Sequence, residues 1–468
     1  MSRLLEFRSA AQEIRDTSVG TAIVLLLASL AMMVLSGFAA VSHDVGLNGH
    51  VCFAISSLVA IVTVVCCRLY RTVTVGFFFV VLLVLFHGGI VLLQLFGLDV
   101  SGFNAADSLW LDLASLARPS AIAAFGVAAF ATGYSSAFVL STGWGKKHAN
   151  YDECRCPTSS YSSVSTAVLG IVLLVVGVMG WYVVLLGSGL SPFGTTYVAL
   201  LETATFPYMQ YFYLAIGLGL VIVTASGRRG YGWAALVFFT TFAMPAFVMG
   251  LRGEVLIPIA ATIVVASRRG FPVRVWHVFL GLAASLWVGS IIRVSRIEEG
   301  GISSSVLDAS FWDGLVETGY SIRPLYEILN SPIVSAYPTG LATYWSPLRR
   351  IIVGRLGGIE VPPIDLDPAV YWTAVTKDIG PIGGSIIAEA FLSGRMWGVA
   401  LVLLCVGMLA AFLDSTRFEK SSDVIVGSVG LILFQWVRGD FTPIPLSLGI
   451  VAGVTLLSAG LARLKVNK

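Results

Sequence analysis

The sequence predicts an all-α polytopic membrane protein with about twelve transmembrane helices, and its composition and its apolar runs lead to this fold class. Hydrophobic residues occupy 57% of the 468 positions and charged residues only 12%, and the mean hydropathy is +0.88. Soluble globular domains carry about 25% charged residues, so the composition excludes that class. The apolar residues also form runs of about 17 to 25 residues, the length needed to cross a bilayer as a helix.

Twelve such runs are expected to span the membrane, and the eighth and eleventh are short. They cover residues 19–41, 51–67, 73–96, 119–142, 164–187, 209–226, 231–250, 254–267, 276–293, 383–413, 424–437 and 444–462. The first run is long and is not followed by a small-residue cleavage pattern, so we expect a span rather than a cleaved signal peptide. The sequence shows no soluble domain and no repeat, so we expect residues 1–468 to form one membrane domain.

The basic residues recur in alternate connections, as the positive-inside rule requires. A cytoplasmic N-terminus places on the inner side Arg3, Arg8, Arg15, Arg68, Arg71, Lys146, Lys147, Arg155, Arg228, Arg229, Arg268, Arg269, Arg274, Arg417, Lys420, Arg463, Lys465 and Lys468. We therefore expect both termini in the cytoplasm.

The longest connection, residues 294–382, is expected on the outer, periplasmic or extracellular side. It contains too many aromatic and aliphatic residues to be disordered, and long ordered loops are usually functional. In "SIRPLYEIL", Pro324 favours the start of a helix, which would place Glu327 one turn after Arg323. This pair is either a local salt bridge or part of a binding site.

A second basic cluster in this connection is "SPLRRIIVGR", which contains Arg349, Arg350 and Arg355. Such clusters at a membrane surface bind lipid head groups or phosphate, or they form a solvated face.

Two short outer connections each place an arginine beside a glycine and a carboxylate. Arg252 and Glu254 lie in "GLRGEVL", between the seventh and eighth spans, and Arg438 lies in "VRGDF", between the last two. These arginines are either interfacial anchors or an anion site, because a guanidinium is permanently charged and its fork fits phosphate.

The glycine-rich stretch "KDIGPIGGSIIAEAFLSGRMWG" adds Asp378, Glu389 and Arg395. A glutamate facing lipid is costly, so we expect Glu389 to face a cavity or a re-entrant turn. The arginines suit a substrate with a diphosphate leaving group, and one carboxylate would accept a proton from an acceptor hydroxyl. No metal-ligand spacing is present, and we expect a metal-independent reaction without a cofactor.

The order of these parts resembles the O-antigen polymerase (Wzy) family of bacterial membrane enzymes. The resemblance lies in the span number, the "GLRGEVL" turn, a large late outer loop containing "RPLYEIL", and "GGSIIAEAFLSGRMWGV" before the next span. It implies a fold of the GT-C type. It also implies diphosphate binding by Arg252, and it matches Arg323 to the basic residue of the family's large loop. From the residues themselves, Arg323, Arg349, Arg350 and Arg438 are further candidates for diphosphate binding. Related ligases carry a histidine in the large loop, and residues 294–382 contain none. The base stays open among Glu327, Asp378, Glu389 and Glu254.

The function expected from the residues and the resemblance is polymerisation of oligosaccharide repeat units carried on undecaprenyl diphosphate, at the outer face of the bacterial inner membrane. Membrane lipid is a partner, no nucleic acid is expected, and association with a chain-length regulator stays open. The alternatives are a twelve-span transporter or lipid-linked oligosaccharide flippase, and a polyprenyl-phosphate mannosyltransferase. Transporters place their site near the midplane and are built from repeats, whereas the charges here gather at the outer rim. Such mannosyltransferases carry acidic residues in the first outer loop, which here offers only Asp44.

Overall fold

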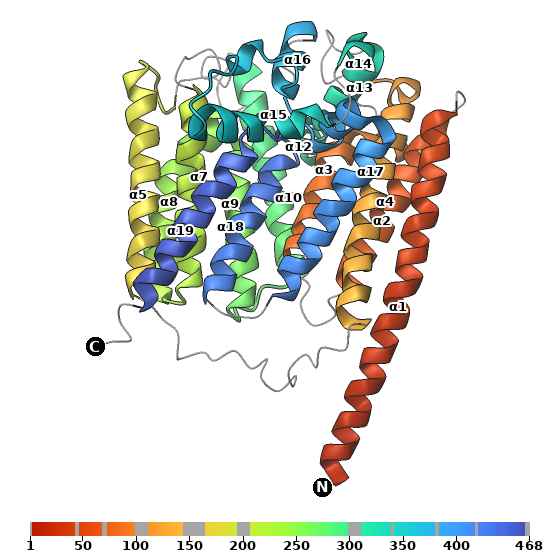
Figure 1. Ribbon diagram of the computed structural model, residues 1–468, viewed down its shortest axis with the longest axis horizontal. Helices are drawn as coiled ribbons and strands as arrows, with labels where there is room; N and C mark the ends of the chain where they lie inside the picture. Colours follow the sequence, from red (N-terminus) through yellow and green to blue (C-terminus); the bar gives the residue numbers. More distant parts are fainter. Residues whose placement is uncertain are drawn as a thin grey trace. The chain divides into compact units, whose positions relative to one another are not determined.

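The computed structural model describes residues 2–42, 46–67, 73–98, 111–143, 164–193, 206–297, 310–337, 341–379, 383–416 and 420–463. These residues form helices and short connections, with no strand among them (Figure 1). Eleven of the twelve predicted spans each coincide with one helix, and the tenth coincides with two helical pieces separated by a break. Within the described ranges, seven helices are long and apolar enough to cross a membrane, and four shorter apolar helices accompany them. The predicted all-α membrane fold is confirmed.

The chain divides into two compact units, and the first falls within Met1–Ala149, Leu315–Ser415 and Trp436–Pro443. Its long helices are α1 (Ser2–Val41), α2 (Gly46–Cys67), α3 (Val75–Leu95), α4 (Leu113–Gly143) and α17 (Ile386–Ser415). Its short elements are η4 (Tyr320–Ile322), α13 (Arg323–Asn330), α14 (Ile333–Ala336), α15 (Ala342–Arg349), η5 (Arg350–Leu356), η6 (Ile364–Leu366) and α16 (Tyr371–Asp378). The predicted long connection is therefore helical and ordered where it is described.

Helix α4 is the centre of this unit, and α1, α2 and α17 pack against it. Gly133 lies against the backbone of Leu404, and Gly407 lies against the backbone of Phe130, so a Cβ at either glycine would collide with the facing helix. Small residues allow membrane helices to approach this closely. Asp414 of α17 caps α3, since it accepts hydrogen bonds from the backbone amides of Val75 (2.8 Å) and Gly76 (3.0 Å).

The second unit falls within Asn150–Gly314, Thr416–Gln435 and Ile444–Lys468. Its helices are α5 (Val164–Gly187), α7 (Phe206–Ala225), α8 (Arg229–Met249), α9 (Arg252–Arg268), α10 (Val275–Ile297), most of α18 (Lys420–Trp436) and α19 (Ile444–Arg463). The chain passes from this unit to the first within α12 (Phe311–Gly319).

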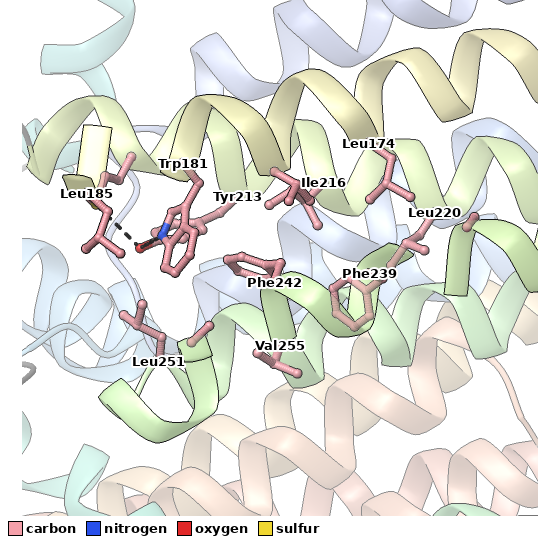
Figure 2. Close-up of a cluster of buried hydrophobic side chains, with 14 of the residues drawn as sticks. Leu174, Trp181, Leu185, Tyr213, Ile216, Leu220, Phe239, Phe242, Leu251 and Val255 are labelled. Carbon is pink, nitrogen blue, oxygen red and sulfur yellow. Dashed lines mark hydrogen bonds between the residues drawn. The ribbon is translucent and has the colours of Figure 1, made fainter. Parts of the chain in front are cut away.

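The core of the second unit is an aromatic cluster between α5, α7 and α8 (Figure 2). Trp181 and Phe242 meet edge to face with their ring centroids 5.1 Å apart. The indole of Trp181 also donates a hydrogen bond to the hydroxyl of Tyr213 (3.3 Å). Edge-to-face packing and a satisfied indole N–H are the usual arrangement of buried aromatic residues.

One group of predicted inner-side charges is buried in the second unit. The Nε atoms of Arg268 and Arg269 lie 2.7 and 2.8 Å from the two carboxylate oxygens of Asp423, whose side chain is 1% exposed. The carboxylate thus joins the end of α9 to the start of α18. Burial requires such pairing, because an isolated charge would be strongly destabilising there.

Candidate functional site

The predicted turn at Arg252 is confirmed and belongs to the second unit. Gly250 ends α8 with a φ of 94°, the left-handed conformation that favours glycine. Helix α9 then begins at Arg252 with Glu254 in its first turn, where a carboxylate interacts favourably with the helix dipole. The guanidinium Nη2 of Arg252 donates a hydrogen bond of 2.6 Å to the carbonyl of Gly289 in α10.

In the first unit, Arg323 and Glu327 form the local salt bridge that their spacing allows. The Nε atom of Arg323 lies 3.2 Å from Oε1 of Glu327, and the two side chains are 27% and 26% exposed. Pro324 occupies the first turn of α13, as predicted. The pair remains accessible to a ligand, but the guanidinium already compensates the charge of Glu327.

The cluster of Arg349 and Arg350 is arranged around Asp367, a residue that sequence reasoning missed. Nη2 of Arg350 lies 2.8 Å from Oδ2 of Asp367, and Nη2 of Arg349 lies 3.6 Å from the same oxygen. The hydroxyl of Ser346 donates to this oxygen (2.7 Å), and the amide of Ala369 donates to Oδ1 (3.0 Å). Burial acts to raise the pKa of Asp367, but these hydrogen bonds and Arg350 outweigh it and hold the pKa below its ordinary value.

Glu389 is fully buried and joins three parts of the first unit. Its Oε1 accepts from the hydroxyl of Thr343 (2.8 Å), and its Oε2 accepts from the indole of Trp436 (3.1 Å). The amide of Phe441 donates to both oxygens, at 3.1 and 3.0 Å. The carboxylate therefore fixes the start of α15 and the 436–443 turn against α17, and its lone pairs are largely used.

The predicted tenth span, 383–413, consists of two helical pieces rather than one. Gly394 and Arg395 have non-helical backbone angles inside α17, and Arg395 has a φ of 54°. The chain bends sharply enough that a Cβ on Gly398 would collide with the carbonyl of Ala390. Glu389 therefore lies in a short helical piece folded against the longer one.

The turn that contains Arg438 lies against the same helical piece. Gly439 contacts the backbone of Gly384 so closely that a Cβ on Gly384 would collide with it. The guanidinium of Arg438 lies 5.8 Å from the ring centroid of Phe86 in α3, and its side chain is exposed. Asp440 accepts a hydrogen bond of 2.6 Å from the hydroxyl of Thr442, and burial raises its pKa.

One turn of α3, residues 86–90, brings these segments together. The guanidinium of Arg438 lies over the ring of Phe86. Nε2 of His87 lies 2.7 Å from the hydroxyl of Ser385, which precedes Glu389 by four residues. Gly89 lies directly against Gly319, at the end of α12 and four residues before Arg323. Three segments far apart in the sequence therefore meet at one place in the first unit.

Tyrosine hydroxyls surround Glu389, and two of them lack a hydrogen-bond partner among the described residues. These are the buried hydroxyls of Tyr344 and Tyr371, whereas the hydroxyl of Tyr337 donates to the carbonyl of Ala369. Burial raises the pKa of all three, and the charge of Glu389 contributes. Buried polar groups without a protein partner are uncommon and mark places where a ligand or water completes the bonding.

The comparisons with known proteins decide the family. The model for "O-antigen polysaccharide polymerase Wzy" matches residues 19–332, more than half of the chain. The chain belongs to this family. Protein CapE of Staphylococcus aureus is 21% identical over 268 residues, which cover 57% of this chain and 58% of CapE. This Wzy-family chain thus spans less than two thirds of that relative. No solved structure matches it.

The structure of this Wzy-family protein brings only some of the predicted site residues together. Glu389, Arg438 and the helix of Arg323 converge near residues 86–90 of α3, and Arg349 pairs with Arg350 around Asp367. Asp378 is exposed at the end of α16. Arg252 and Glu254 belong to the other unit, so their role in diphosphate binding or proton transfer stays a prediction.

Sequence reasoning missed Asp367, Asp440 and the three tyrosines as site residues. Asp440 had a signal, because it follows Arg438 in the Arg-Gly-Asp turn that the sequence singles out. Asp367 had none, since it lies in a proline-containing loop whose fold decides its partners. Within the described ranges, no group of three or more His, Cys, Asp or Glu side chains is placed to hold a metal ion.

Proposed function

We propose that this protein polymerises oligosaccharide repeat units carried on undecaprenyl diphosphate, at the outer face of the bacterial inner membrane. The observation that carries the proposal is the meeting of the Arg438 turn, the Glu389 helix and the Arg323 helix on one turn of α3. Cations and carboxylates on separate segments are what a diphosphate-linked donor and a hydroxyl acceptor require. Membership of the O-antigen polysaccharide polymerase family supports the same chemistry.

In the proposed reaction, an acceptor hydroxyl attacks the anomeric carbon of the donor sugar. A new C–O bond forms as the bond to the diphosphate oxygen breaks, and the diphosphate leaves with the electron pair. Arg438, which is exposed, would compensate the charge that develops on the leaving group, and Arg323 is the next candidate in the same unit. Arginine in this role would supply the charge that a metal ion supplies in other transferases.

We assign proton acceptance to Asp440 rather than to Glu389. Asp440 follows Arg438, the group assigned to the leaving diphosphate, by two positions in the same turn. Glu389 accepts four hydrogen bonds from its neighbours, so we assign it the positioning of the Arg438 turn. Glu327 and Asp378 remain candidates, the first paired with Arg323 and the second exposed.

Variants expressed in a bacterium that lacks its own polymerase test the proposal. We expect Arg438→Ala, Arg323→Ala and Asp440→Asn to abolish long polymer while the protein still reaches the membrane, because removal of one charge-stabilising or proton-accepting group costs roughly 10²- to 10⁴-fold. Arg274→Ala, an exposed arginine outside the site, is the matched control. Long polymer from all three site variants would refute the proposal.

A further inference from the structure

The helical segment formed by α15 and η5 has an apolar side that no described residue covers. In Figure 1 the segment lies across the direction of α17, a long helix of the same unit. Trp345, Ile352 and Leu356 are 60%, 52% and 80% exposed, and the side chain of Arg349 is 42% exposed. Residues 350–356 form a π-helix that continues α15. The exposed side chains follow one another along this segment at intervals of four, three and four residues.

The opposite side of this segment holds it to the protein. Thr343, Ser346 and Pro347 are buried, and the first two donate hydrogen bonds to Glu389 and Asp367. The exposed apolar stripe is therefore fixed in place. A helix with one polar, bonded side and one side carrying Trp, Ile, Leu and Arg is typical of segments that lie in the membrane interface.

A cavity of about 430 Å³ opens beside this stripe. It is lined by Arg350, Gly354, Arg355, Ile359, Val361 and Ile364. Arg350 is held by Asp367, but the guanidinium of Arg355 forms no hydrogen bond or ion pair with any described residue and is exposed. Arginine provides the only charged groups in the lining, while Ile359 and Ile364, 62% and 47% exposed, form an apolar rim.

We propose that this surface binds an anionic phospholipid of the bilayer, and that it anchors the segment 342–364 in the membrane interface. The phosphate occupies the cavity beside Arg355 and Arg350, and the acyl chains lie along Trp345, Ile352 and Leu356. The charge of Arg355 is complementary to the head group, and tryptophan favours the interface. This site is separate from the polymerase reaction and does not depend on it.

Lipid binding by the full-length protein in detergent tests whether the charge of Arg355 binds the anionic head group. We expect short-chain phosphatidylglycerol to bind more tightly than phosphatidylcholine. Arg355→Gln should weaken only the phosphatidylglycerol, by about fivefold, the contribution of one arginine near an anionic surface. Arg274→Gln removes the same charge elsewhere and should change neither affinity. Equal binding by wild type and Arg355→Gln would overturn the proposal. Farnesyl diphosphate, a short prenyl diphosphate, is tested in the same way. An Arg355→Gln protein that loses farnesyl diphosphate binding but keeps phosphatidylglycerol binding would also overturn the proposal, because the cavity would then serve the lipid-linked substrate.

A second measurement tests the apolar contact independently. Full-length protein in nanodiscs that contain phosphatidylglycerol with brominated acyl chains is compared with its Trp345→Phe variant. The difference between the two fluorescence signals is the contribution of Trp345. We expect the brominated acyl chains to quench this contribution. A Trp345 signal that bromine leaves unquenched would place the residue in water and overturn the proposal. Size-exclusion chromatography confirms that both proteins are folded.

Discussion

Glu389 offers the sharpest test of the reasoning, because replacement by glutamine and by leucine should differ strongly. In Glu389→Gln the amide nitrogen can face Thr343, whose hydroxyl can accept a hydrogen bond. The remaining oxygen can still accept from Trp436 and Phe441. Every donor around the side chain thus keeps an acceptor, so we expect a loss of no more than about 1 kcal/mol, the net contribution of one hydrogen bond.

In Glu389→Leu the indole N–H of Trp436 and the amide of Phe441 both lose their acceptor in a buried place. Each unsatisfied donor costs about 1–3 kcal/mol, so the free energy of unfolding should fall by roughly 2–6 kcal/mol. Thermal unfolding of the purified variants in one detergent, followed by tryptophan fluorescence, gives the order of stability.

The same pair of variants separates positioning from proton transfer. A residue that positions the Arg438 turn should keep polymerase activity in Glu389→Gln and lose it in Glu389→Leu. A folded Glu389→Gln protein that makes no polymer would refute the positioning role and make Glu389 the proton acceptor. Equal destabilisation by glutamine and leucine would refute the hydrogen-bond argument itself.

Three further predictions concern packing and charge. Asp423→Asn leaves the buried Arg268 and the partly exposed Arg269 without their carboxylate, so the free energy of unfolding should fall by about 3–5 kcal/mol; an unchanged melting temperature in detergent would contradict this. Gly398→Ala should destabilise by roughly 1–3 kcal/mol through the collision with Ala390, whereas Gly449→Ala, where the added methyl group meets open space, should not lower the melting temperature. The folded pKa of Asp367 lies below its unfolded value of about 3.9. Its stabilising contribution is therefore complete above that pH and is lost as the pH falls through the folded pKa. A melting-temperature profile from neutral to acidic pH should lose this acid-dependent step in Asp367→Asn, and an identical profile would contradict the assignment.

The fold was predictable from the sequence because a bilayer constrains it strongly. Each backbone polar group in the hydrocarbon must be bonded within its own helix, so the length of an apolar run nearly determines the element. The predicted turn at Gly250 and Arg252 and the helix start at Pro324 depend on local chemistry, and both are confirmed. The break at Gly394 and Arg395 was not predicted. The cost of a glutamate that faces lipid predicted only that Glu389 faces a cavity or a re-entrant turn.

The site was predictable only in part, since its partners are set by tertiary contacts. The i,i+4 pair of Arg323 and Glu327 could be read directly from its spacing. The pairing of Arg350 with Asp367 is set by the fold of the loop between η5 and α16, and nothing in the spacing of the residues indicates it. The bonding of Glu389 to Phe441 joins residues 52 positions apart, a contact that a single sequence does not reveal.

Product analysis of a purified reaction tests the central claim most directly. The full-length protein in detergent is incubated with an undecaprenyl-diphosphate-linked repeat unit, with a chelator present, and the products are resolved by size. The proposal predicts a ladder of products that differ by one repeat unit, which disappears in Arg438→Ala and Asp440→Asn and persists in Arg274→Ala. Unchanged substrate with wild-type protein that is shown to be folded would contradict polymerase activity and favour transport of the lipid-linked unit.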